Sequence, residues 1–186
     1  MMELQGKFLI AMPHLDDYFN RTVVFMCEHN DQGSMGLVIN QPTDLSIAEL
    51  YSKLNFMMKN DRTFSNEMVV AGGPMHSERG FILHKNTPNE FQHTYKITDD
   101  LSMTTSADVI ETLGSELAPE KYLIALGCSS WEAGQLEKEI TDNAWLVATA
   151  NEQILFDMPY DERYVAANQL LGIHPHNFVF AQVGHS

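Results

Sequence analysis

The apolar residues of this sequence come in short, β-rich runs that follow one another with few helices between them. Three such runs open the chain, at Lys7 to Met12, Thr22 to Glu28 and Met35 to Asn40. Runs of this length and composition predict strands. The last two flank the turn-forming string HNDQGSMG, so we predict that they pair as an antiparallel hairpin.

The same pattern continues along the rest of the chain. Further strands are predicted at Met68 to Ala71, Gly80 to Lys85, His93 to Thr98, Leu101 to Thr104, Lys121 to Gly127, Ala144 to Ala150, Gln153 to Phe156 and Asn177 to Val183. Apolar residues at helical spacing follow helix-start signals at Ser46, where Glu49 completes a capping box within a helix predicted from Asp44, and at Thr105, Ser129 and Asp161. The first of these helices is expected to run to Met58 and the last to end at Gly172.

Roughly ten strands against about four helices, grouped more than alternating, favour an α+β fold over a doubly wound parallel sheet. A bent or barrel-like, mostly antiparallel sheet accommodates this order of elements. Because no repeat, low-complexity run or Pro/Gly/Ser-rich linker divides the chain, we predict a single domain over residues 1–186.

The segment GCSSWEAGQLEKEITDN follows the strand Lys121 to Gly127, and Ser129 and Glu132 have the spacing of a capping box. We therefore predict a sharp turn from the strand directly into a helix. A thiol at a helix N-terminus can have a lowered pKa, so Cys128 is a candidate nucleophile. The alternative, which we favour, is that Cys128 is a small packing residue.

Charge excludes several classes of partner. Eleven Lys and Arg against 25 Asp and Glu give a formal net charge of -14. Such a surface repels phosphate backbones and anionic lipid, which disfavours direct DNA binding and membrane association. No apolar run approaches the roughly 20 residues that span a bilayer, and the N-terminus does not resemble a signal peptide. We expect a cytoplasmic protein.

Common cofactor and metal motifs are missing. The sequence contains no phosphate-binding loop, no G-x-G-x-x-G, no H-E-x-x-H and no C-x-x-C. His174, His176 and His185 are interpreted as loop histidines. We therefore predict neither a cofactor nor a metal.

A glycine pair provides the candidate ligand site. Gly72 and Gly73 follow a strand, and glycines there allow a ligand to approach the backbone N–H groups. We predict that this pair lies beside the Gly127 to Trp131 segment and lines a shared concave site, with Trp131 as an apolar wall and Gln135 or Glu139 as polar contacts. Alternatively, the glycines only form a tight turn and Trp131 only anchors its helix in the core.

Several strings together carry a family resemblance. GKFLIAMP, EHNDQGSMGLVINQP, AGGP with RGFILH, SSWEAGQLEKEITDNAWL and the closing GHS make the whole chain resemble the YqgE/AlgH family of bacterial proteins. The resemblance implies an α+β fold with a bent or bifurcated, partly barrel-closed sheet surrounded by helices, and a bacterial cytosolic location. Association with exopolysaccharide regulation gave the family a regulator label, and it has no settled catalytic residues. Relatives usually carry an aromatic residue at position 128, which argues against a thiol mechanism throughout the family.

These observations favour a non-enzymatic regulatory or binding module for a small anionic ligand or a protein partner. One alternative is a hydrolase or transferase that uses the Gly127 to Gln135 turn, with Cys128 or a nearby serine as nucleophile. Another is a transcriptional regulator, which the acidic charge disfavours. Oligomeric state and the identity of any partner stay open.

Overall fold

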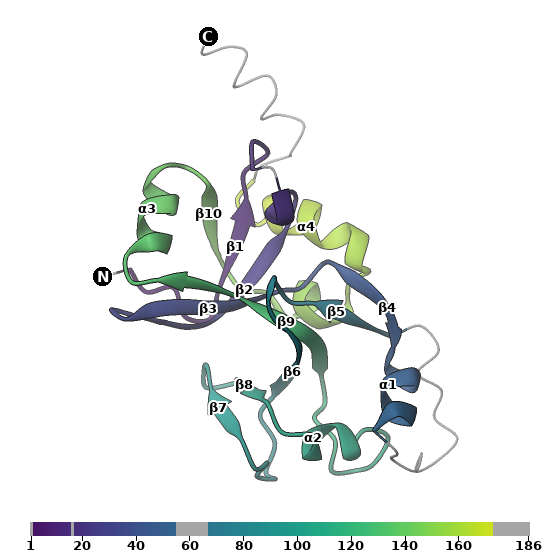
Figure 1. The fold of residues 1–186 in the computed structure, drawn as a ribbon. Helices are drawn as coiled ribbons and strands as arrows, with labels where there is room; N and C mark the ends of the chain where they lie inside the picture. Colours follow the sequence, from purple (N-terminus) through teal and green to yellow (C-terminus); the bar gives the residue numbers. More distant parts are fainter. Residues whose placement is uncertain (1, 16, 55–66, 173–186) are drawn as a thin grey trace.

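The computed structural model describes all residues except 1, 16, 55–66 and 173–186 (Figure 1). The strands are β1 (Lys7–Ala11), β2 (Val23–Asn30), β3 (Gly33–Val38), β4 (Pro42–Ser46), β5 (Met68–Ala71), β6 (Met75–Lys85), β7 (Thr94–Lys96), β8 (Leu101–Thr104), β9 (Tyr122–Glu132) and β10 (Trp145–Thr149). The α-helices are α1 (Ile47–Lys53), α2 (Asp108–Glu111), α3 (Gln135–Thr141) and α4 (Arg163–Gln169). Three short helical segments are η1 (Asp17–Phe19), η2 (Gln153–Asp157) and η3 (Tyr160–Glu162).

The strands form one curled sheet in the order β10-β1-β2-β3-β9-β6-β8-β7, with β4 and β5 branching off it. Strand β9 lies at the branch point. Its last residues pair with β3, whereas its first half lies between β6 on one edge and β5 on the other. The pairing of β5 with β9 is parallel and the other pairings in the described residues are antiparallel. The predicted α+β fold with a bent, bifurcated, partly closed sheet is confirmed (Figure 1).

Two apolar clusters occupy the two sides of this branch point. The larger cluster packs β1, β2 and β3 against α3 and α4, with Phe8 and Phe25 in an edge-to-face contact at its centre. The smaller cluster lies under α1 and α2, where Tyr51 and Leu113 are buried. Burying large aliphatic and aromatic side chains is the main stabilising contribution to such a fold.

Several local predictions are confirmed. Strands β2 and β3 form the predicted hairpin. Ser46 caps α1, since its side chain accepts a hydrogen bond from the Glu49 N–H and Glu49 reaches back to Ser46. The helix begins at Ile47 because the preceding residues pair with β5 as β4. The helix ends at Lys53, before the predicted end at Met58, which lies outside the described residues. The predicted strand Asn177 to Val183 also lies outside them.

The predicted helix start at Ser129 is wrong. Strand β9 continues to Glu132, because Ser129, Ser130, Trp131 and Glu132 pair with the four residues Gly33 to Gly36 of β3. Long-range strand pairing thus overrides the local capping signal. Helix α3 begins at Gln135, after Gly134 reverses the chain at φ +78°. The turn is therefore at 133–134 and not at Gly127.

The predicted strand at Gln153 to Phe156 is also wrong. These residues form the helical segment η2, which Asn151 starts by accepting a hydrogen bond from the Ile154 N–H. Strand β10, which precedes this segment, pairs with β1. The predicted helix near Asp161 is present as α4, and Gly172 follows it at φ +71°. Within the described residues, no helix is long and apolar enough to cross a membrane.

Candidate functional site

The glycine pair and strand β9 are in direct contact. The Gly72 N–H donates to the Leu126 carbonyl at 2.9 Å, and the Ser129 hydroxyl donates to the Gly72 carbonyl at 3.1 Å. A Cβ atom on Gly73 would overlap the main chain of Cys128. These glycines therefore let two backbones pack closely, which uses the space that a ligand would need.

Trp131, Gln135 and Glu139 form a hydrogen-bonded cluster that joins α3 to the sheet. One carboxylate oxygen of Glu139 accepts from the indole N–H of Trp131 at 3.1 Å and from that of Trp145 at 3.0 Å. The other accepts from the Gln135 amide at 2.9 Å. Trp131 is only 5% exposed and stacks on Phe19. This geometry matches the alternative in which Trp131 is a core anchor.

A shallow hollow of about 260 Å³ lies beside Trp131. Its other walls come from the β2–β3 hairpin, including Glu28, Ser34 and Met35, and neither Gly72 nor Gly73 lines it. The structure thus places the two predicted segments in contact without gathering all five predicted ligand-binding residues around one cavity. Ligand binding by these residues stays a prediction.

Cys128 lies inside β9 and is 3% exposed. Burial raises the pKa of its thiol, and the nearby charge of Arg79 only partly opposes this effect. The neighbouring Ser129 is fully buried and its hydroxyl already donates to Gly72. Because β9 does not end at this point, the helix N-terminus that would activate the thiol is absent.

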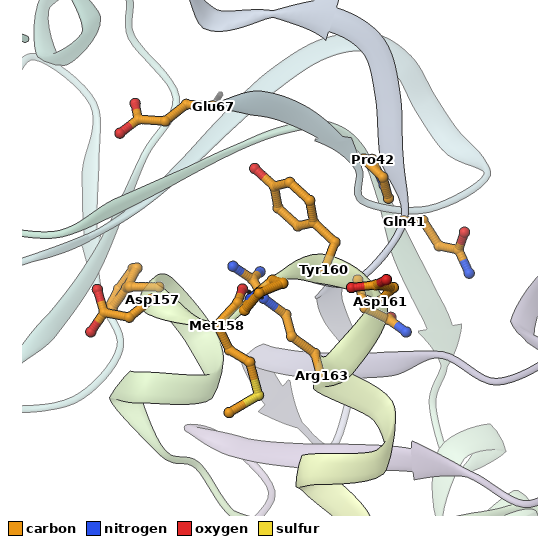
Figure 2. Close-up of a pocket in the computed structure, with 11 residues that line it drawn as sticks. Gln41, Pro42, Glu67, Asp157, Met158, Tyr160, Asp161 and Arg163 are labelled. Atoms are coloured by element: carbon orange, nitrogen blue, oxygen red, sulfur yellow. Dashed lines mark hydrogen bonds between the residues drawn. The ribbon is translucent and has the colours of Figure 1, made fainter. Parts of the chain in front are cut away.

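A cavity of about 830 Å³ lies elsewhere in the described part of the chain (Figure 2). It is formed by the segment that leads into β4, by Glu67, and by the chain from η2 to the start of α4. Its lining residues are Asn40, Gln41, Pro42, Glu67, Phe156, Asp157, Met158, Pro159, Tyr160, Asp161 and Arg163.

Arg163 is the buried cation of this cavity. It is 3% exposed, and its guanidinium donates from Nε to the Met158 carbonyl at 2.9 Å and from Nη1 to the Ile39 carbonyl at 2.6 Å. Its charge also lies 4.7 Å from the centre of the Tyr160 ring. Burial lowers the pKa of Arg163 to about 10, so the group is still cationic at neutral pH.

The charge of Asp157 favours the cationic form of Arg163 from a distance, without forming an ion pair with it. Among the described residues, no carboxylate forms an ion pair with Arg163, and its Nη2 nitrogen makes no hydrogen bond. A buried charge without a partner carries a large desolvation cost. Arg163 therefore keeps unused donors at the edge of a cavity, and no carboxylate of the described residues is bonded to it.

The walls around Arg163 are held in place by other hydrogen bonds. The Tyr160 hydroxyl donates to the Met68 carbonyl at 3.1 Å and accepts from the Met68 N–H at 3.2 Å. Glu67 accepts from the Tyr122 hydroxyl at 2.7 Å, and Asp157 is paired with Lys121. The cavity is thus preformed by contacts that leave Arg163 free to bind.

A second hollow, of about 450 Å³, contains an ordered chain of hydrogen bonds. His84 Nδ1 lies 2.9 Å from the Lys85 carbonyl, so Nδ1 carries the proton and Nε2 accepts from the Thr104 hydroxyl at 2.7 Å. Thr94 continues the chain at 2.8 Å from Thr104. Burial lowers the pKa of His84, which keeps the imidazole neutral. These contacts tie β7 and β8 to β6.

Comparison with known proteins gives the family. A family model described as AlgH-like matches residues 8–176. The chain belongs to the AlgH-like family. A UPF0301 protein of Haemophilus influenzae is 87% identical over 186 residues, and one of Pasteurella multocida is 64% identical over the same length; both matches cover 100% of each chain.

Solved structures agree with this assignment. The solution structure of the AlgH protein from Pseudomonas aeruginosa is similar with a TM-score of 0.77 at 42% identity, over 96% of this chain and 97% of that chain. A crystal structure of a Corynebacterium diphtheriae protein has a TM-score of 0.70 at 16% identity, over 89% and 86% of the two chains. The second likeness concerns the fold alone. The predicted family is therefore confirmed.

Sequence reasoning missed the Arg163 cavity of this AlgH-like protein. One signal was available, because a cation at the first position of a helix opposes the helix dipole. The string YDERYVAANQL places Arg163 both at that position and next to the apolar face that Tyr164 and Ala167 define. An arginine that is unfavourable for its helix and still buried points to a role outside that helix.

Proposed function

We propose that this AlgH-like protein is a non-enzymatic binding module that recognises a small ligand through an anionic group. The observation that carries the proposal is the buried guanidinium of Arg163, bonded to no carboxylate of the described residues, at the edge of an 830 Å³ cavity. An anionic oxygen that accepts from Nη2 would pair with this charge and satisfy the unused donors. Charge-assisted hydrogen bonds of this kind are about twice as strong as neutral ones.

The other features of the cavity are those of a binding site. Phe156, Met158 and Tyr160 provide apolar and aromatic surface, while Asn40 and Gln41 provide neutral polar groups. Binding sites for small molecules combine apolar walls with a few fixed polar groups in this way. Cys128 and Ser129 are buried, so neither is placed as the nucleophile that the alternative hydrolase or transferase needs.

The test is a titration of the full-length, ¹⁵N-labelled protein, followed by NMR, with a panel of metabolites that each carry a carboxylate or phosphate group. We expect at least one compound to give saturable shifts that include the Arg163 side-chain Nε–H and the main chain of residues 156–163. Arg163→Lys keeps the charge but loses the forked geometry, so the same compound should bind about tenfold more weakly. Gln5→Ala, far along the chain from the cavity, is the control and should bind normally.

Two results would refute the proposal. One is a panel in which no compound shifts the lining residues up to about 10 mM, a concentration that excludes dissociation constants in the millimolar range. The other is saturable binding that Arg163→Lys leaves unchanged while the variant keeps the wild-type NMR spectrum elsewhere.

A further inference from the structure

The charges around the cavity are not those of a site for simple anions. Its lining contains one cation, Arg163, and three carboxylates, Glu67, Asp157 and Asp161. Asp157 forms an ion pair with Lys121, whereas Glu67 and Asp161 form no ion pair within the described residues. The cavity therefore presents one buried positive charge against two unneutralised negative charges.

The net charge of the whole protein is also unfavourable for a simple anion. With a formal net charge of -14, its field repels an approaching anion before the ligand reaches Arg163. A ligand that carries no net charge avoids that repulsion. If such a ligand carries separate positive and negative groups, its negative group can still bind the guanidinium of Arg163.

The positions of these groups favour such a dipolar ligand. Figure 2 shows the Arg163 side chain passing beneath Tyr160 toward the side of the cavity where Asp157 lies, with Asp161 on the opposite side and Glu67 across the cavity beyond Tyr160. Arg163 is buried, Asp161 is exposed and Glu67 is half-buried. The positive charge thus lies deep and the free negative charges lie nearer the opening.

The apolar walls set the remaining character of the ligand. Phe156, Met158 and the Tyr160 ring add apolar and aromatic surface to the same lining that carries the charged groups. An aliphatic or aromatic ligand body can pack against them and gain from burial. A bare inorganic anion would leave most of this surface in contact with water.

Building on the proposed function, we infer that the ligand is a zwitterion of the amino-acid class. Its carboxylate binds Arg163, its apolar body packs on Phe156, Met158 and Tyr160, and its ammonium group lies nearer the opening, on the side of Glu67 or on the side of Asp161. The two opposite charges fix the orientation of the ligand. Repulsion from the like charge in the cavity disfavours compounds that carry only one of the two groups.

Four probes of equal carbon number separate the contributions. Hexanoate carries the anion alone, hexylamine carries the cation alone, and norleucine and 6-aminohexanoate carry both with different spacing. Each is titrated into the full-length wild-type protein and followed by the NMR signals of residues 156–163. We expect the better zwitterion to bind about tenfold or more tightly than hexanoate and than hexylamine.

A variant tests the acidic groups themselves. In Glu67→Gln/Asp161→Asn, the shape of the cavity is kept and the negative charges are removed. The preference for the zwitterion over hexanoate should fall from about tenfold to about one, because hexanoate gains affinity and the zwitterion loses it. Glu132→Gln, an exposed carboxylate at the end of β9, is the matched control and should keep the wild-type preference.

The outcomes distinguish this inference from the proposed function. If hexanoate binds as tightly as either zwitterion, the inference is wrong and the anion-binding function stands. If hexylamine binds most tightly, both are wrong. If none of the four probes gives saturable shifts, the amino-acid class is refuted, and the wider metabolite panel decides whether another anionic ligand binds.

Discussion

Replacement of Glu139 by alanine should destabilise the protein more than any other substitution of an acidic residue on α3. The Glu139 carboxylate accepts hydrogen bonds from Trp131, Trp145 and Gln135, and both tryptophans are buried. Hydrogen bonds to a charged group contribute about 1.5 to 3 kcal/mol each, and an indole N–H that loses its partner pays its desolvation cost. Counting only the two indole bonds, we expect Glu139→Ala to lower the free energy of unfolding by roughly 3 to 6 kcal/mol.

Urea denaturation followed by tryptophan fluorescence measures this loss directly. The chain has 2 tryptophans, and both donate to Glu139, so the signal reports on the site that is changed. Glu139→Gln keeps an oxygen that can accept from the indoles, and it should lose about half as much as the alanine variant. Glu132→Ala, an exposed carboxylate near the same helix, is the control and should stay within about 0.5 kcal/mol of wild type. A loss below about 1 kcal/mol for Glu139→Ala would refute the view that this carboxylate anchors α3.

Three further outcomes follow from the structure. Gly73→Ala should destabilise by about 2 kcal/mol or more in thermal melts, because its Cβ would overlap the main chain of Cys128; a melting temperature equal to that of wild type would contradict the close packing. Cys27 and Cys128 are both buried with raised thiol pKa values, so a disulfide reagent should modify them only after denaturant is added; stoichiometric labelling of the native protein would argue against this burial. Burial lowers the pKa of His84 below its ordinary 6.5, so folding favours the neutral form. The stability advantage of wild type over His84→Gln should therefore be complete above about pH 7 and decrease as the pH falls through 6.5, and an advantage that is constant from pH 7 to 5 would rule out this linkage.

Local signals predicted the elements of this protein well where tertiary contacts agree with them. The β2–β3 hairpin, the Ser46 cap of α1 and the glycine that follows α4 are all present. At Ser129, the capping signal and the sheet conflict, and pairing of four residues with β3 prevails. A single sequence does not reveal that β3, almost a hundred residues earlier, is the partner, so this error could not be corrected locally.

The candidate sites, too, were predictable only where local sequence signals determine them. The contact between Gly72 and β9 was predicted correctly, but glycines that approach a ligand and glycines that approach another strand have the same sequence signature. The Arg163 cavity brings together the start of β4, Glu67 and the chain from η2 to the start of α4, which have no shared local motif. The one signal for this cavity in the sequence is an arginine at the first position of a helix, where its charge opposes the helix dipole.

The central position of β9 has a consequence for how the chain folds as it is synthesised. Three strands that precede it, β3, β5 and β6, gain their central partner only when Tyr122 to Glu132 have left the ribosome. Until then, each of them has an unpaired edge, and unpaired edges can join other chains. At about 5 to 20 residues per second, synthesis of the preceding residues takes several seconds or more. A nascent chain stalled before Tyr122 should therefore depend on chaperones, whereas one stalled far enough beyond Glu132 for β9 to emerge should be protected from proteolysis.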